Sequence, residues 1–499
     1  MGRKKKALRN LTVSLLLEIV NIFSGLILPR LIIGFYGSPT NGLINSITSF
    51  IGYVALLQSG VGSVIKAALY KPLAEGNKEA INDIVFTLES FFKKIALIST
   101  IYCVLLACIY PFCVLDEFDY WFTASLIIFI SLSTIAQYLW GMPYQLLLEA
   151  DQKGYVYSLI QTVVVLVNTS LSIILINKGL SIQVVKLVTS AVYIARPVII
   201  RYYTRNNYNL KLTGNINYAL LKSRWDGFAQ AIAYYIHSKT DIFVLTIFAV
   251  LSDVSVYSIY ALVISVVTIV IKALDQAVSP AFGNIIAKEE GILNDRFEIY
   301  CFIIHNLSAV LFGATCISIM NFIRIYTRDI SDYNYIRILF GAILITSEYV
   351  YCFRLPYNSI IYAAGKIKET RNSAILEAAI NIVLSIIFVK IGGMEGVALA
   401  TLIAMVYRML SLINYLKKDV LYLSTKKEIK QIFISFIDYV PSIIIMIMIE
   451  RKRLFVKSFI SWFIFAFIIT ILYVLYIVLV NLIFNRTEFK RACLYLLGR

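Results

Sequence analysis

A chain of 499 residues in which 60% are hydrophobic and 15% are charged, with a mean hydropathy of +0.80, lies outside the composition of soluble globular proteins. The formal net charge is +17, but the Lys and Arg residues are scattered through short loops, which argues against a folded basic face for nucleic acid. The seven cysteines form no CxxC pair and have no histidine at ligand spacing, so neither a disulfide nor a metal site is predicted.

Apolar runs of about 20 residues, the length that crosses roughly 30 Å of hydrocarbon, recur along the whole chain. The first follows the basic segment MGRKKKALRN; it is too long for a signal-peptide core and has no small-residue cleavage site nearby. Hydropathy predicts about fourteen transmembrane helices, at residues 11–33, 41–65, 95–115, 121–148, 155–177, 181–200, 227–251, 255–283, 299–325, 335–363, 372–391, 394–416, 432–450 and 458–484.

The loops between these spans predict the topology. If the N-terminus is cytoplasmic, the lysine-rich and arginine-rich loops fall inside, whereas the outer loops LDEFDY and VLSDVS carry no Lys or Arg. The positive-inside rule then places both termini in the cytoplasm. The basic loop ERKRLFVK, 450–457, falls outside in this topology. Either the rule is broken there or one of the last two spans does not cross.

The chain contains an internal repeat. The segment from Met142, MPYQLLLEADQKGYVYSLIQTVVVLVNTSLSIILINKG, aligns without a gap to the segment from Leu355, LPYNSIIYAAGKIKETRNSAILEAAINIVLSIIFVKIG, so that Pro143 pairs with Pro356 and Asn168 with Asn381. Six spans per copy leave both copies in the same orientation. The sequence therefore predicts an all-α polytopic membrane protein with two parallel six-helix lobes related by an axis along the membrane normal.

Parallel repeats of this kind are an architecture of secondary transporters, with the substrate site between the lobes. The predicted boundaries are 1–215 for the N-terminal lobe and 216–420 for the C-terminal lobe. Residues 421–499 add the final two spans and a basic cytoplasmic tail.

Polar side chains share one face of the span at 227–251. At steps of four, four, three and four, this face carries Asp226, Gln230, Tyr234, His237 and Asp241. Lys239 points the other way. The repeat maps this face onto the first span, as Ser14, Glu18, Asn21, Gly25 and Pro29. Because an unpaired charge at mid-bilayer is costly, His237 and Asp241 predict either a cavity between the lobes or satisfied interhelical hydrogen bonds.

Two further spans carry polar or small faces. The span at 41–65 and its end present Asn41, Asn45, Thr48, Gly52, Ala55, Ser59, Gly62 and Lys66, and the span at 255–283 presents Ser265, Thr268, Lys272, Asp275 and Ser279. Small residues in membrane helices also mark close helix packing, so packing and cavity lining remain alternatives for the first of these faces.

A catalytic constellation is not found in the sequence. The two histidines, His237 and His305, lie in apolar spans, and HExxH, GxSxG and phosphate-loop motifs are absent. We therefore expect a transporter, not an enzyme.

The segment LPRLIIGFYGSPTNGLINSITSFIGYVALLQSGVGSVIKAALYKPLA, 28–74, resembles the opening of bacterial polysaccharide and O-antigen (Wzx-like) flippases of the multidrug/oligosaccharidyl-lipid/polysaccharide exporter superfamily. The matching residues are Arg30, Gly37, Gly42, Gly60 and Gly62. The second repeat is similar in SKTDIFVLTIF and in the segment from Leu355. The resemblance covers the first twelve spans, and its motifs are mostly architectural.

This resemblance implies a flippase in the bacterial plasma membrane that turns a polyprenyl-pyrophosphate-linked oligosaccharide from the inner to the outer leaflet by alternating access. It implies membrane lipids, and surface-polysaccharide polymerases and glycosyltransferases, as partners, and no nucleic acid. The residues expected to bind the substrate are Arg30, Lys66, Lys272, Asn41 and Asn45.

Relatives of this kind couple transport to H⁺ or Na⁺, and no other cofactor is expected. On the basis of face and depth alone, the candidates for coupling are Glu18, His237, Asp241 and Asp275. Two alternatives remain. A cation-coupled drug or metabolite exporter of the same fold would use the carboxylates, although Arg30 and Lys272 oppose it. A membrane glycosyl polymerase or ligase would need a large external loop, which the sequence lacks.

Overall fold

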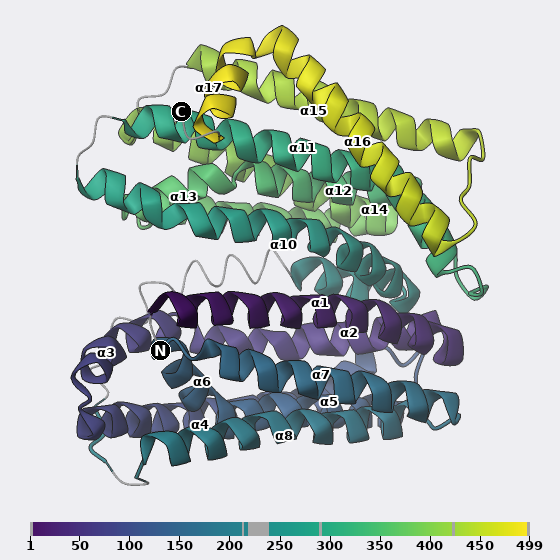
Figure 1. Cartoon of the computed structure of the whole chain (residues 1–499). Helices are drawn as coiled ribbons and strands as arrows, with labels where there is room; N and C mark the ends of the chain where they lie inside the picture. The colour runs from purple at the N-terminus through teal and green to yellow at the C-terminus, as the bar shows by residue number, and fades with distance from the viewer. Residues whose placement is uncertain (1–2, 212–213, 218–238, 289–291, 422–424, 497–499) are drawn as a thin grey trace. The chain divides into compact units, whose positions relative to one another are not determined.

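The computed structural model describes residues 3–211, 214–217, 239–288, 292–421 and 425–496. These residues form α-helices joined by short turns, with two 3-10 segments and one π segment and no strand (Figure 1). Contacts divide the chain into unit 1, Met1–Ser255, and unit 2, Val256–Arg499. The predicted all-α polytopic class is confirmed.

Unit 1 is built on pairs of long helices: α1 packs along α7, and α5 packs along α8. Its elements are α1 (Arg3–Tyr36), α2 (Ser38–Gly52), η1 (Tyr53–Gln58), α3 (Val61–Glu75), α4 (Lys78–Ile109), η2 (Tyr110–Cys113), α5 (Tyr120–Ala136), the π segment η3 (Gln137–Gly141), α6 (Met142–Ala150), α7 (Gly154–Asn177) and α8 (Ile182–Tyr208). Residues 239–248 are also helical and belong to this unit.

Unit 2 has α11 at its centre, packed against α12, α15 and α16, while α12 packs against α14. Its elements are α10 (Leu251–Ala287, whose first turn belongs to unit 1), α11 (Leu293–Tyr326), α12 (Ile338–Phe353), α13 (Leu355–Ala363), α14 (Arg371–Asp419), α15 (Thr425–Arg451), α16 (Phe459–Phe484) and α17 (Arg486–Leu496).

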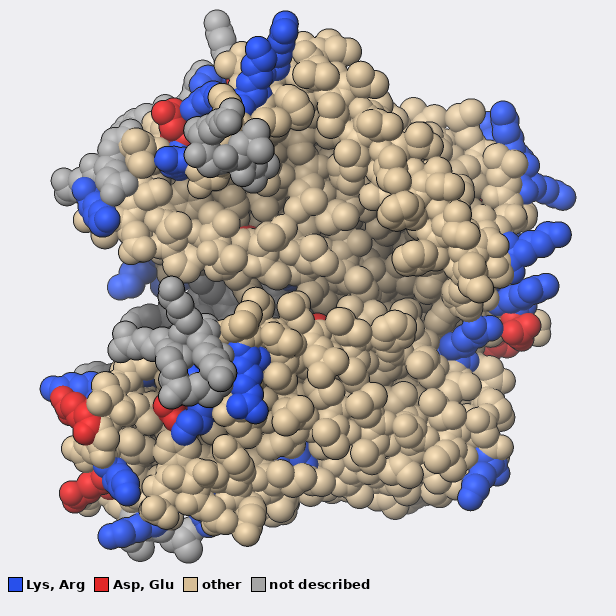
Figure 2. All heavy atoms as spheres, viewed as in Figure 1, with Lys and Arg blue, Asp and Glu red and all other residues tan. Residues whose placement is uncertain are grey.

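Twelve helical segments of the described residues are long and apolar enough to cross a membrane, which is consistent with about fourteen predicted spans. The predicted spans 372–391 and 394–416 lie within the single element α14, interrupted by non-helical backbone at Gly392 and Gly393. Most of the predicted span 227–251 lies outside the described residues. Figure 2 shows most Lys and Arg side chains toward the two edges of the view, where the helices drawn in Figure 1 end, and few charged side chains over the middle of each unit.

The structure corrects one predicted helix, 41–65. The chain leaves the helix after η1, and α3 begins at Val61 because Gly60 adopts φ 78°, a left-handed conformation that glycine tolerates best. The internal repeat is visible in the burial of its members: Tyr144 and Tyr357 are both almost fully buried. Pro143 and Pro356 each stand at the start of a new helix, α6 and α13, where a missing N–H is tolerated.

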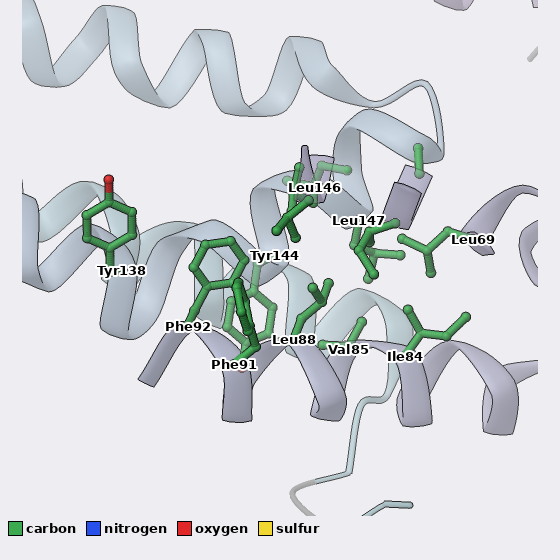
Figure 3. Close-up of a cluster of buried hydrophobic side chains, with 14 of the residues drawn as sticks. Leu69, Ile84, Val85, Leu88, Phe91, Phe92, Tyr138, Tyr144, Leu146 and Leu147 are labelled. Carbon is green, nitrogen blue, oxygen red and sulfur yellow. The ribbon is translucent and has the colours of Figure 1, made fainter. Parts of the chain in front are cut away.

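The core of unit 1 lies where α3, α4 and α6 meet. Figure 3 shows Leu88 and Phe92 of α4 facing Tyr144 and Leu147 of α6, with Leu69 of α3 at one side. A polar group closes one edge of this cluster. Tyr144 donates a hydrogen bond to Glu89, whose carboxylate lies 3.0 Å from Nη2 of Arg205 on α8. The ion pair therefore ties α4 to α8 across the α6 tyrosine.

The basic loop at 450–457 joins two full-length apolar helices, α15 and α16. It packs on the C-terminal end of α11, where Arg324 lies 2.7 Å from Glu450 and its guanidinium lies 3.7 Å from the ring centre of Phe455. Asn321 of the same helix accepts a hydrogen bond from the Val456 amide. The loop is thus packed against the rest of unit 2, and its Glu450 neutralises Arg324 of α11.

Candidate functional site

The spans of unit 2 contain a group of charged and aromatic side chains that we call the unit 2 charged cluster: Lys272, Glu348, Tyr351, Arg354, Glu377 and Arg408. On α10, Thr268 and Lys272 are one helical turn apart and share a face. Thr268 donates a 3.2 Å hydrogen bond to Oε2 of Glu348, and Lys272 and Arg354 are the cations that act on that carboxylate. The ring of Tyr351 has Lys272 at 4.5 Å and Arg354 at 5.0 Å from its centre.

Glu377 anchors the deeper half of the cluster. Its carboxylate lies 2.5 Å from Nη1 of Arg354 and 3.6 Å from Nε of Arg408, and all three side chains are buried. Arg408 also donates to the Thr370 carbonyl at 2.9 Å and to the Ser373 hydroxyl. Three cations face two carboxylates, so the cluster has one excess positive charge inside a membrane-spanning unit. Lys272 is its half-buried cation; the two arginines are enclosed.

Asp275 follows Lys272 on α10 but belongs to a different contact group. Its Oδ1 accepts hydrogen bonds from the Tyr300 hydroxyl at 2.5 Å and the Ser359 hydroxyl at 2.7 Å, which join α10 to α11 and α13. The carboxylate is buried and has neutral partners.

In unit 1, Asn41 and Asn45 lie on α2. Asn41 is buried and donates a 2.8 Å hydrogen bond to Ser255, whereas Asn45 is half-buried and donates to the Asn41 carbonyl of its own helix. The helices approach closely here, because a Cβ on Gly42 would lie only 1.8 Å from the Leu251 carbonyl oxygen. For Asn41, this environment is one of helix packing.

Lys66 lies on α3 and pairs with Glu149 of α6 at 2.9 Å. A chain of side-chain hydrogen bonds leads onward from Glu149, through Gln145 and Gln137, to Arg196 of α8. Arg196 donates to Gln137 at 2.9 Å and to Gln161 at 2.6 Å. Both partners of the guanidinium are neutral amides, and Gln137 begins the π segment η3, a deviation often found at functional sites. The sequence places Arg196 in an apolar span, but only the fold joins it to Lys66.

The remaining predicted residues lie on or near α1 and the 239–248 helix. Arg30 is half-buried on α1 and Glu18 is exposed on the same helix. Asp241 is buried near Tyr53 of η1, which hydrogen-bonds Thr240. His237 lies outside the described residues.

Glu348, Arg354 and Glu377 are not among the site residues predicted from the sequence. A signal was present, because each is an ionisable residue in or beside an apolar run, and such groups mark functional or paired positions by default. Their mutual pairing could not be anticipated, since Arg354 and Glu377 lie on different helices.

Neither the protein-family models nor the curated proteins include a match to this chain. Solved structures do match. The lipid II flippase MurJ in an inward closed conformation has a TM-score of 0.70 at 17% identity, covering 95% of this chain and 99% of MurJ. An inward-facing multidrug resistance MATE family transporter of the MOP superfamily has a TM-score of 0.57 at 14% identity, covering 83% of this chain and 99% of its own.

A third match is the MATE multidrug transporter DinF-BH, with a TM-score of 0.58 at 14% identity, covering 85% of this chain and 98% of its own. At these identities the likeness concerns the fold. The chain thus has the fold shared by the MurJ flippase and by MATE transporters of the MOP superfamily.

Proposed function

We propose that this protein is a flippase that moves a polyprenyl-pyrophosphate-linked oligosaccharide, the repeat unit of a surface polysaccharide, from the inner to the outer leaflet by alternating access. The observation that carries the proposal is the excess positive charge of the unit 2 charged cluster, in a chain whose fold matches a lipid II flippase along nearly its whole length.

A pyrophosphate cannot cross hydrocarbon unaccompanied, because burying an isolated charged group costs tens of kcal/mol by a Born estimate. A cation that is partly accessible reduces this cost. Lys272 fits this role because it is half-buried, whereas Arg354 and Arg408 are enclosed and share Glu377. Lysine binds phosphate as a point charge, which tolerates a moving ligand. We assign Lys272 as the main head-group residue.

The other proposed ligands contribute less directly. Arg30 on α1 is a second, half-buried cation. Lys66 would have to exchange Glu149 for the substrate, since the two already lie 2.9 Å apart. Asn45 offers a half-buried amide, whereas Asn41 serves helix packing first. We retain Glu18, His237, Asp241 and Asp275 as the proposed groups for H⁺ or Na⁺ coupling.

In this proposal the chain spans a bacterial cell membrane many times, with both termini in the cytoplasm. Its partners are membrane lipids and the polymerase and glycosyltransferases that use and make the lipid-linked oligosaccharide. MurJ, the matching flippase, is named for a lipid substrate, lipid II, which supports a lipid-borne substrate here.

A cation-coupled exporter is the second candidate. Two observations favour it. Unit 1 and unit 2 each contain a buried carboxylate, Asp241 and Asp275 respectively, and the fold matches multidrug MATE transporters. Carboxylates suit a cationic substrate, and a lipophilic cation is therefore the competing probe.

Leaflet transfer in proteoliposomes decides between the two. We expect transfer of a labelled polyprenyl-pyrophosphate oligosaccharide by the wild type and a loss of about tenfold in Lys272→Ala, the size of one charge-assisted contact. Lys366→Ala is the matched control, because Lys366 is an exposed lysine of the same unit paired with Glu369. Transfer of a lipophilic cation alone would contradict the flippase proposal and favour the exporter.

A further inference from the structure

Pro441 interrupts the main-chain hydrogen bonds of α15, a helix of unit 2 whose residues 429–451 are apolar enough to span a membrane. Because proline has no N–H, the carbonyl of Ile437, four residues earlier, loses its helical donor. The hydroxyl of Tyr476 on α16 donates to this carbonyl at 2.9 Å. The hydroxyl of Tyr473, one turn earlier on α16, donates to the Asp438 carbonyl at 2.6 Å. Two tyrosines of α16 thus donate hydrogen bonds to the main-chain carbonyls of Ile437 and Asp438 just before the break.

A third tyrosine holds the same turn from the other side. Tyr349 of α12 donates to the Ser435 carbonyl at 3.2 Å, and its ring stacks on that of Tyr439 with centres 4.4 Å apart. The turn before Pro441 is therefore clamped between α12 and α16 by hydroxyl-to-carbonyl bonds, which require close packing of all three helices.

The carboxyl group of Asp438 is enclosed within this clamp. Asp438 is 3% exposed, and its Oδ1 atom is buried without a hydrogen-bond partner. The titratable groups that face it are the hydroxyls of Tyr349 from α12 and of Tyr473 and Tyr476 from α16. On α11, Cys316 lies against the neighbouring Tyr439. Among the described residues, no Lys, Arg or His is paired with this carboxyl group.

An ionised carboxylate in this position would cost several kcal/mol, because it has lost water and gained no cation. The packed arrangement therefore favours the neutral acid. We propose that Asp438 is a proton-binding site at the Pro441 break, and that releasing its proton to water weakens the packing of α15 on α12 and α16.

The proposal is independent of the substrate. It concerns neither the unit 2 charged cluster nor the carboxylates proposed for coupling. By linkage, a group that holds its proton more tightly when packed stabilises that packing at low pH and withdraws this stabilisation as the pH rises. The α15–α16 pair would thus respond to proton concentration.

Hydrogen–deuterium exchange of the full-length protein in lipid nanodiscs tests the proposal. The readout is the exchange of main-chain amides at 435–446, corrected for the intrinsic rate at each pH, between about pH 6 and pH 9. We expect the corrected rate of the wild type to rise by about tenfold or more, the factor that corresponds to one pKa unit of linkage. Asp438→Asn, which is neutral and of the same size, should remain slow throughout.

Glu450→Gln is the matched control. Glu450 is a buried carboxylate of the same helix, but it is paired with Arg324 at 2.7 Å. This variant should lose stability at the loop end and keep the pH dependence of residues 435–446. A flat wild-type profile overturns the proposal, as does a pH dependence that Asp438→Asn leaves unchanged.

Discussion

Oε1 of Glu377 lies 2.5 Å from Nη1 of Arg354, and the opposite oxygen of the same carboxylate lies 3.6 Å from Nε of Arg408. One buried carboxylate thus balances two guanidinium groups within the spans of unit 2, and this relationship has a direct consequence for stability.

Replacing Glu377 with Gln should destabilise the protein strongly. The change removes the carboxylate that two enclosed guanidinium groups share, and removing one partner of a buried pair costs about 3–5 kcal/mol. We expect a large fall in folded yield and thermal stability in detergent. Glu369→Gln is the control, since Glu369 forms an exposed pair with Lys366 that contributes at most about 1 kcal/mol. Equal melting temperatures for the two variants would contradict the role of Glu377.

Gly42→Ala should prevent normal packing of unit 1. A Cβ at this position would meet the Leu251 carbonyl at 1.8 Å, a backbone atom that cannot move aside independently. Gly34→Ala on α1 has nothing within 4 Å and should be neutral or stabilising by about 1 kcal/mol, as expected for alanine in a helix. Monodisperse yield on size-exclusion chromatography measures both. A well-folded Gly42→Ala protein would rule out the close approach.

Arg196→Lys should disrupt the polar chain of unit 1 although the charge is kept. A lysine ammonium cannot reproduce the fork that reaches both Gln161 and Gln137. We expect a loss of about 1–3 kcal/mol, because half-buried amide oxygens of Gln137 and Gln161 lose their charged donors. Lys66→Ala should cost less than about 1 kcal/mol, because the Lys66–Glu149 pair is about one-third exposed. Thermal unfolding of both variants in the same detergent tests whether Arg196→Lys is the more destabilising of the two.

Asp151, in the turn between α6 and α7, predicts how the stability of the protein changes at acidic pH. Burial opposes its charge, but hydrogen bonds from Lys153 and Tyr208 and the charge of Lys6 prevail and hold the pKa of Asp151 below its usual value. A carboxyl group whose pKa is lower in the folded state than in the unfolded state stabilises the fold at any pH above its unfolded-state pKa. This stabilisation is lost as the pH falls through the folded-state pKa. Asp151→Asn should therefore lower stability at neutral pH and narrow its difference from wild type below about pH 4. A constant difference would contradict this.

His237 and Asp241 carry a prediction about transport. His237→Ala and Asp241→Ala should impair transport without loss of folded protein, whereas Lys239→Ala should mainly lower the yield. The structure buries Asp241 and leaves Lys239 half-buried. Normal leaflet transfer by the first two variants would remove them from the proposed coupling set.

The number and positions of the spans could be predicted because length and hydropathy alone decide whether a run can remain in hydrocarbon. One exception arises from glycine. Gly60 interrupts the predicted helix 41–65, whereas the non-helical backbone at Gly392 and Gly393 lies where the predicted spans 372–391 and 394–416 separate. A glycine permits several backbone conformations, and its neighbours in the fold select one of them.

By itself, the sequence determined the membrane-spanning helical class and its internal repeat, because these depend on hydropathy and on the recurrence of residues along the chain. Only the tertiary structure decided which polar groups meet. Asn41 and Ser255 are 214 positions apart, and Lys66 and Glu149 are 83 apart. Helical periodicity shows that two residues share a face, but the partner across that face is chosen by how the helices pack.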